Sequence, residues 1–162
     1  MWSVFSAHAA AVGACGGGSQ KGAANKRAFR RIVAGGEVPG LLAYAGEQPV
    51  GWCAVRPRDV FPRLDRSRIL RPVDDEPVWS VVCLFVARES RRMGISRRLL
   101  EAAMRYAKKQ GAGILEGYPV EPKKDKMPDA FAWTGIASAY RAAGFEEVAR
   151  RSETRPIMRY YL

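Results

Sequence analysis

Apolar and polar residues follow one another in patterns that predict helices and strands in a definite order. Over Ala23–Ala34, apolar residues recur at helical spacing and basic residues cover the other face, which predicts an amphipathic helix ending at Gly35. Two short apolar segments follow, 41–45 and 50–55, and Gly46–Pro49 between them has the length and composition of a hairpin turn. These segments predict an antiparallel pair of strands.

The second half of the chain predicts a strand–helix–strand unit followed by two more strands. Residues 78–86 are almost all apolar, with many β-branched and aromatic side chains, as in a central strand buried on both faces. The apolar spacing after them predicts a long amphipathic helix that ends near Gly111. A strand over 113–118, a helix over 137–143 and strands over 145–151 and 156–162 complete the series. Because only a mixed sheet accommodates both hairpins and a strand–helix–strand crossover, we predict an α/β fold.

Two segments are less regular. Residues 1–22 are rich in glycine and alanine and have no basic residue before Lys21, which argues against an export signal and predicts a flexible leader with a short helix over Trp2–Val12. The prolines and charges of 56–77 predict a long loop with a helical turn near 62–68, either a solvated connector or a functional loop. The length of 162 residues fits one domain, which we place at 23–162.

Composition narrows the classes of function. The chain has 27 Lys and Arg against 16 Asp and Glu, a formal net charge of +11, which favours anionic partners. Its single histidine, His8, and three widely spaced cysteines provide no zinc site, no disulfide framework and no Ser-His or Cys-His hydrolase site outside the leader, so we expect no metal. The odd number of cysteines fits a reducing compartment, so we expect a cytoplasmic protein, and no segment is apolar enough to span a membrane.

The turn between the apolar strand and the long helix has features that suit a phosphate group. The first turn of a helix has unpaired backbone N–H groups, and the helix dipole adds positive potential at the same place. Gly94 lets a ligand approach the backbone closely because it has no Cβ. Four arginines surround it: Arg91, Arg92, Arg97 and Arg98. We therefore predict a phosphate or pyrophosphate site at this turn.

Two motifs point to a family. Arg91-Arg92-Met93-Gly94-Ile95-Ser96 fits the pattern Gln or Arg, two variable residues, Gly, one variable residue, then Gly or Ala, with Ser96 as a small substitute. Further along, Tyr140-Arg141-Ala142-Ala143-Gly144-Phe145 fits the pattern Tyr, three residues, Gly-Phe, and precedes the final strand pair. With these motifs in this order, residues 38–162 resemble the GNAT superfamily of acyl-CoA-dependent N-acetyltransferases. The resemblance implies a GNAT-like mixed, mostly antiparallel central sheet flanked by helices.

The resemblance also implies a reaction and the residues that perform it. A primary amine of a small molecule or protein would attack the thioester of acetyl-CoA directly. The cofactor-binding residues would be Leu84, Phe85, Val86, Arg91, Arg92, Met93, Gly94, Ile95, Ser96 and Arg97. Main-chain groups of the first three would pair with the pantetheine arm like an added strand, and backbone N–H groups of the turn would hold the pyrophosphate. Tyr140 matches the general acid that protonates the departing thiolate.

The chain departs from the superfamily at three places. Trp133 stands where many relatives have Asn. The central strand has no carboxylate base, so Glu116 in the next strand and a water held near Ser80 are equal candidates, although a neutral amine needs neither and Glu116 could be an ordinary exposed strand residue. The N-terminal segment is short or atypical, so the first strand is either missing, which leaves the acceptor pocket open, or replaced by a second subunit.

Two other functions remain open from the sequence. The net charge of +11 allows a basic nucleic-acid-associated binding module, although no known reading motif is present and this alternative is not favoured. The missing carboxylate and Trp133 allow a CoA-binding GNAT fold without catalysis. An unpaired C-terminal strand would offer an edge for a homodimer.

Overall fold

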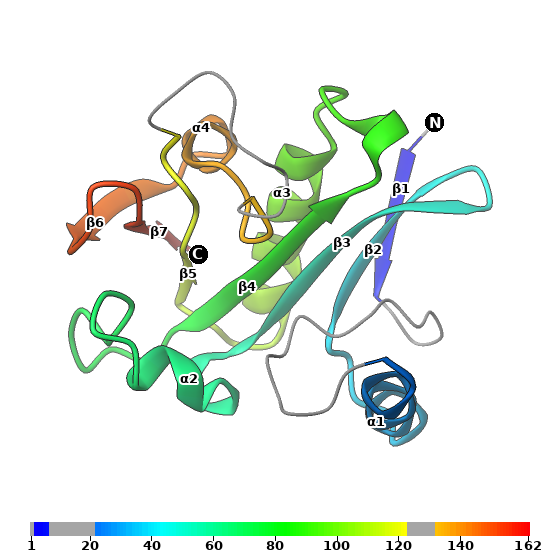
Figure 1. The fold of residues 1–162 in the computed structure, drawn as a ribbon, viewed down its shortest axis with the longest axis horizontal. Coiled ribbons are helices and arrows are strands. Elements are labelled where there is room, and N and C mark those ends of the chain that lie inside the picture. The colour runs from blue at the N-terminus through cyan, green and yellow to red at the C-terminus, as the bar shows by residue number, and fades with distance from the viewer. Residues whose placement is uncertain (1, 7–21, 123–131) are drawn as a thin grey trace.

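The computed structural model describes residues 2–6, 22–122 and 132–162. At its centre is a seven-stranded sheet in the order β1-β2-β3-β4-β5-β7-β6 (Figure 1). The strands are β1 (Trp2–Ser6), β2 (Gly40–Ala45), β3 (Gln48–Pro57), β4 (Trp79–Val86), β5 (Ile114–Gly117), β6 (Glu146–Arg150) and β7 (Pro156–Tyr161). β4 and β5 run parallel, and the other neighbouring strands are antiparallel. The predicted mixed, mostly antiparallel α/β sheet is confirmed.

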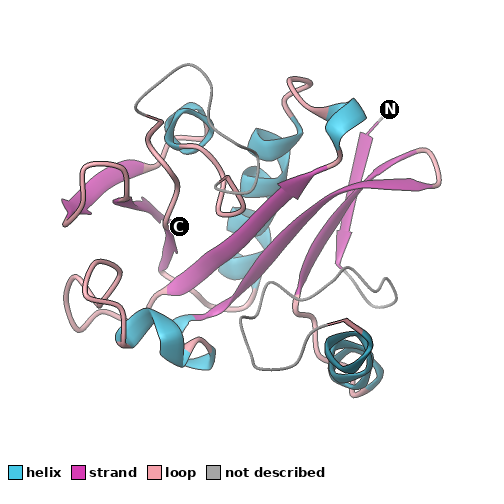
Figure 2. Cartoon of the chain, viewed as in Figure 1, coloured by secondary structure: helices cyan, strands magenta, loops and turns pink. Residues whose placement is uncertain are grey.

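Helices cover both faces of the sheet (Figure 2). They are α1 (Ala23–Ala34), α2 (Pro62–Asp65), α3 (Ile95–Lys109) and α4 (Ala137–Ala142), with single 3₁₀ turns at Arg58–Val60 and Arg88–Ser90. The apolar stripe of α3 packs on β2, β3 and β4, and its Leu99 and Leu100 are fully buried. On the other face, Phe29 of α1 meets the ring of Trp52 edge-on at 5.8 Å. The sheet has an apolar core on each face. Neighbouring side chains of β2 face opposite sides, so Leu41 belongs to the core on the α3 side and Leu42 to the core on the α1 side.

The N-terminal strand corrects the predicted helix over Trp2–Val12. Residues Trp2–Ser6 form β1, which pairs antiparallel with β2. Without it, β2 would expose an edge of unpaired N–H and C=O groups, so pairing across the sheet outweighs local helical spacing. The first strand is therefore present in this chain, against the prediction that it is missing or supplied by a partner. The rest of the predicted leader that follows β1, residues 7–21, lies outside the described residues.

The C-terminal strand corrects a second prediction. β7 pairs with β5 on one side and with β6 on the other, so it is not an unpaired edge. The edge belongs to β6, where Glu146, Glu147 and Arg150 place charges along the strand. Charged edges discourage pairing with another chain. The edge on which the homodimer prediction rested is thus an interior strand.

The segment 56–77 contains the predicted helical turn, α2, and packs on the sheet. Leu64 is buried against Tyr118 and Ile157.

Cys53 and Cys83 are buried as free thiols, and burial raises the pKa of Cys53 to about 12, so this side chain packs as an apolar group. Within the described part of the chain, no helix is both long and apolar enough to cross a membrane.

Candidate functional site

The site begins where β4 separates from β5, while β4 stays paired with β3 as far as Val86. β3 pairs Ala54 with Cys83 and the next residue, Val55, with Val81, so Val82 is an extra residue that bulges out of β4. β5 pairs with β4 only through Trp79–Val81 and then ends at Gly117. Because β4 continues to Val86, the two parallel strands diverge beyond Val81. The predicted arm-binding residues Leu84, Phe85 and Val86 lie on this diverging end of β4.

The turn after β4 has the geometry of an anion site. Gly94 caps α3 in the left-handed region, with φ of +75°, and Arg92 is also left-handed, with φ of +62°. A Cβ built on Gly94 meets no described atom within 4 Å, so the space over this residue is open. The first helical bond of α3 runs from Arg98 N–H to Gly94 O at 3.2 Å, which leaves the N–H groups before it pointing out of the helix end.

Arginines fix and surround this turn. Arg91 Nε donates to Val86 O at 3.2 Å, which ties the turn back to the end of β4. Arg92, Arg97 and Arg98 are exposed beside the helix start. Met93 is 52% exposed, while Ile95 is buried in the core and Ser96 is half-buried. The turn therefore offers backbone N–H groups and positive charge at one exposed place.

Residues 132–135 fill the space between the diverging strands (Figure 1). Leu84 N–H of β4 donates to Trp133 O at 2.8 Å. On the opposite side, Val120 N–H donates to Gly135 O at 2.9 Å, and Val120 forms a parallel bridge with Ile136. One of the backbone donors predicted for the pantetheine arm is thus occupied by the chain itself.

Tyr140 of α4 lies directly behind this segment. Its side chain is fully buried, and its hydroxyl donates to Thr134 O at 3.1 Å. Burial raises the pKa of Tyr140 well above its usual value, so the phenol stays protonated and able to donate. The ring packs edge-on against Phe145 at 5.0 Å between centroids, and Gly117 and Gly135 lie against the ring. The predicted acid is therefore held in one orientation by its neighbours.

Gly117→Ala should destabilise the protein by displacing this ring. A Cβ at position 117 would overlap Cε1 of Tyr140, and it would lie 2.9 Å from Cζ. Because Tyr140 is closely packed, we expect a loss of about 1–3 kcal/mol in the free energy of unfolding, measured by denaturant titration. Gly113→Ala is the matched control, since its Cβ would meet no described atom within 4 Å and its effect should stay within about 0.5 kcal/mol. Equal stability of the two variants would contradict the packing argument.

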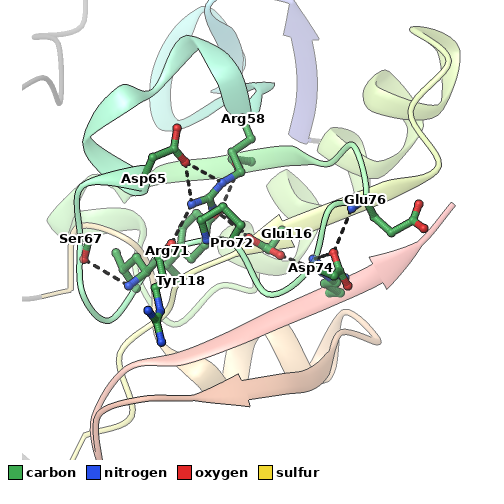
Figure 3. A network of polar contacts seen from close by, with 12 residues as sticks. Arg58, Asp65, Ser67, Arg71, Pro72, Asp74, Glu76, Glu116 and Tyr118 are labelled. Carbon is green, nitrogen blue, oxygen red and sulfur yellow. Dashed lines mark hydrogen bonds and ion pairs between the residues drawn. The ribbon is translucent and has the colours of Figure 1, made fainter.

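Glu116 is buried in a polar network, and Figure 3 shows it beside Arg58 and Tyr118. Because neighbouring residues of a strand face opposite sides and Gly117 lies against the Tyr140 ring, Glu116 lies on the face of the sheet opposite Tyr140. Oε1 accepts from Arg58 Nη1 at 3.1 Å and from the Tyr118 hydroxyl at 2.7 Å, and Oε2 accepts from Arg159 Nε at 2.7 Å. The interpretation of Glu116 as an exposed strand residue is therefore wrong. Both carboxylate oxygens accept hydrogen bonds, and the two guanidinium groups compensate the negative charge of the buried carboxylate.

Tyr118 connects Glu116 to Ser80. Its hydroxyl lies 2.8 Å from Ser80 Oγ and accepts from Arg58 Nη1 at 2.6 Å. Because the phenol gives its one proton to Glu116, Ser80 donates to Tyr118. Burial raises the pKa of Tyr118, so it too stays protonated. The two sequence candidates for the base, Glu116 and the surroundings of Ser80, thus lie at the two ends of one hydrogen-bonded chain.

The network reaches the surface through Asp74. Arg159 donates to both carboxylate oxygens of Asp74, at 2.6 and 2.8 Å, and this guanidinium lowers the pKa of Asp74. The sequence prediction missed Arg58, Tyr118 and Arg159. A glutamate inside a short apolar strand is a signal that cationic partners exist, but it does not tell which of many arginines they are.

A cavity of about 520 Å³ lies beside this network, away from the phosphate turn. Its lining includes Asp59, Glu76, Trp79, Gln110, Glu116 and Arg159. Trp79 starts β4, and Leu84 lies five residues further along the strand, roughly 17 Å at the usual rise per residue. We therefore place the candidate site at the turn around Gly94 and the diverging strands, near Leu84 and Tyr140, with Glu116 between this site and the cavity. Over residues 2–6, 22–122 and 132–162, no group of three or more His, Cys, Asp or Glu could hold a metal ion.

Comparison with known proteins identifies the family of the chain. The sequence model of the Acetyltransferase (GNAT) family matches residues 18–125. The structure of a ribosomal-protein-alanine N-acetyltransferase from Brucella melitensis is 19% identical over 84% of this chain and 75% of the other, with a TM-score of 0.54. A mosquito arylalkylamine N-acetyltransferase-like protein is 13% identical over 90% of this chain and 84% of the other, with a TM-score of 0.57.

A NatC complex bound to a Gag peptide and CoA gives a TM-score of 0.54 at 13% identity, over 85% of this chain and 79% of the other. No curated protein matches the chain. At these identities the solved structures establish a shared fold. Since the family match covers more than half of the sequence and includes the turn around Gly94, the chain belongs to the GNAT acetyltransferase family.

Proposed function

We propose that the protein transfers an acetyl group from acetyl-CoA to a primary amine of a small molecule or protein. The observation that carries this proposal is the turn after β4, where left-handed Gly94 and Arg92 open the N-terminus of α3 to an anion. Family membership supports acetyl transfer as the class of reaction. The structural neighbours include a ribosomal-protein-alanine N-acetyltransferase and an arylalkylamine N-acetyltransferase-like protein, and these names refer to a protein amine and to small amines.

The turn fits the pyrophosphate of acetyl-CoA. The open space over Gly94 would otherwise be filled by a Cβ, and the exposed arginines beside it neutralise phosphate charge. In this proposal backbone N–H groups from Arg92 to Arg97 bind the pyrophosphate, and Leu84, Phe85 and Val86 bind the pantetheine arm with main-chain groups. Acetyl-CoA, when bound, supplies the activated acetyl group as a thioester.

Tyr140 is proposed as the general acid. Its buried, protonated hydroxyl lies beside the end of β5, 3.0 Å from a Cβ built on Gly117, and it donates to the Thr134 carbonyl. Glu116 is proposed as the proton acceptor for the amine through Tyr118 and Ser80, since its own oxygens are held by two arginines. An amine that arrives neutral does not need this route. We also propose a cytoplasmic location, which the buried free thiols of Cys53 and Cys83 support.

Tyr140→Phe should reduce the turnover of acetyl-CoA with an amine acceptor by about tenfold or more, because it removes the donor and keeps the ring. Binding of acetyl-CoA, measured by isothermal titration, should change little. The matched control is Tyr161→Phe, since Tyr161 is 60% exposed and far along β7, and turnover should stay as in the wild type. Unchanged turnover in Tyr140→Phe would rule this residue out as the acid.

The same titrations separate the alternative functions. Saturable binding of acetyl-CoA with release of CoA thiol in the presence of amines supports the proposal. Binding without thiol release from a broad panel of amines would indicate a CoA-binding protein without catalysis. Absence of acetyl-CoA binding, together with salt-dependent binding of a short nucleic-acid duplex, would favour the nucleic-acid alternative.

A further inference from the structure

Three hydrogen-bond donors from different elements converge on two consecutive residues, Trp133 and Thr134. Leu84 N–H of β4 donates to Trp133 O at 2.8 Å, and the Tyr140 hydroxyl of α4 donates to Thr134 O at 3.1 Å. Arg155, next to β7, donates from Nη1 to Thr134 Oγ1 at 3.0 Å. Every one of these contacts presents a donor to an oxygen of the segment 132–135, as a binding site presents donors to a ligand.

The segment is closely seated between these donors. Thr134 is 2% exposed, and the turn is closed by a hydrogen bond from Gly135 N–H to Ala132 O at 2.8 Å. Gly135 has φ of +84°, and a Cβ there would lie 2.8 Å from Leu84 Cδ2 and 3.0 Å from Tyr140 Cε2. The backbone of the segment therefore approaches β4 and the Tyr140 ring as closely as a glycine permits.

Two of the three donors are the groups that the proposed reaction needs. Leu84 N–H belongs to the backbone proposed for the pantetheine arm, and the Tyr140 hydroxyl is the proposed acid. While Trp133 and Thr134 accept from them, neither donor is available to a thioester. The end of the arm and the segment 132–135 would have to use the same space beside β4.

We infer that the segment 132–135 occupies the acetyl end of the cofactor site, that acetyl-CoA displaces it on binding, and that the Arg155–Thr134 hydrogen bond retains it. The inference rests on the proposed function, because it assumes that the arm pairs with β4. A protein whose binding-competent state is only partly populated binds its ligand more weakly by that fraction. Weakening the hold on the segment should therefore strengthen acetyl-CoA binding.

The Arg155 contact is suited to a reversible hold. Arg155 is half-buried, and among the described residues its guanidinium has one hydrogen-bond partner, the Thr134 hydroxyl. Burial lowers the pKa of Arg155, and no carboxylate in the described ranges compensates for this with an ion pair. Arg58 and Arg159, which both contact Glu116, are by contrast paired with carboxylates.

The test measures the dissociation constant of acetyl-CoA for Thr134→Val and Arg155→Gln by isothermal titration. Each change removes the same hydrogen bond from a different side, so each should tighten binding by about threefold or more. Arg151→Gln is the matched control, because it removes an equal charge from the same loop, where Arg151 donates to Arg71 O and Pro72 O. The nucleotide half of CoA, which keeps the pyrophosphate and lacks the arm, is the second ligand, and its affinity should not change.

The outcomes distinguish a failure of the inference from a failure of the proposed function. Tighter acetyl-CoA binding in both variants, with the control and the nucleotide half unchanged, supports the inference. Unchanged or weaker acetyl-CoA binding in the variants overturns it while leaving the phosphate turn in place. Equal tightening of the nucleotide half also overturns it, since the effect would not lie at the arm. If neither wild type nor variants bind acetyl-CoA, the proposed function fails, and the inference fails with it.

Discussion

Gly94→Asp is expected to reduce the affinity for acetyl-CoA by at least about 100-fold, because a carboxylate at this position faces the pyrophosphate. The new side chain would extend into the open space over the turn and could itself accept from the free N–H groups of α3. Aspartate tolerates the left-handed backbone of Gly94 better than most residues, so we expect the variant to fold despite this strain. Isothermal titration with acetyl-CoA, together with a thermal unfolding curve, measures both effects.

Gly111→Asp provides a closely matched control for this experiment. Gly111 follows the other end of α3, has φ of +85°, and its Cβ would meet no described atom within 4 Å. The substitution, the backbone strain and the change in net charge are therefore the same, and only the position on the helix differs. Acetyl-CoA affinity should remain close to that of the wild type. Retained affinity in Gly94→Asp would refute the phosphate turn.

Arg159→Met should destabilise the protein by about 3 kcal/mol or more, because it leaves Glu116 as a buried carboxylate with Oε2 unpartnered. Arg159 is 3% exposed and Glu116 is 1% exposed, so water cannot readily replace the lost partner. The same change removes the two hydrogen bonds that connect Asp74 to β7. Denaturant titration at neutral pH measures the loss.

Two further variants show whether the buried charge is the cause. Arg150→Met makes the same substitution on the neighbouring strand, where Arg150 pairs with exposed Glu147, and it should cost less than about 1 kcal/mol. The double variant Arg159→Met with Glu116→Gln removes the charge that was left unpaired, so it should be more stable than Arg159→Met alone. A double variant that is less stable by the full sum of both changes would show that Glu116 and Arg159 do not depend on each other.

Much of the fold follows from local patterns. The helix predicted over Ala23–Ala34 has those bounds in the structure, and the apolar segment 78–86 is strand β4 at the centre of the sheet. These elements have strong periodicity and clear end signals, such as glycine after a helix. The order of the strands required more, because β7 lies between β5 and β6 and nothing in its own sequence states its neighbours.

The parts of the site that the sequence did not predict depend on contacts between distant residues. The turn around Gly94 was predicted because its residues are consecutive, and the structure places them together. The hydrogen-bond network of Glu116 includes Arg58 and Arg159, which are far apart in the sequence. These contacts allow Glu116 to be buried, although a glutamate in a strand is expected at the surface. The same limit applies to Trp133, whose backbone carbonyl accepts from Leu84 N–H of β4.

The position of β7 in the sheet also affects how the chain can fold during synthesis. β1 to β4 can pair as they emerge from the ribosome, but one side of β5 has its partner only when residues 156–161 have emerged. Until then β5 is an open edge, and Glu116 lacks Arg159. A translational pause before β7 would therefore prolong a state that is prone to aggregate.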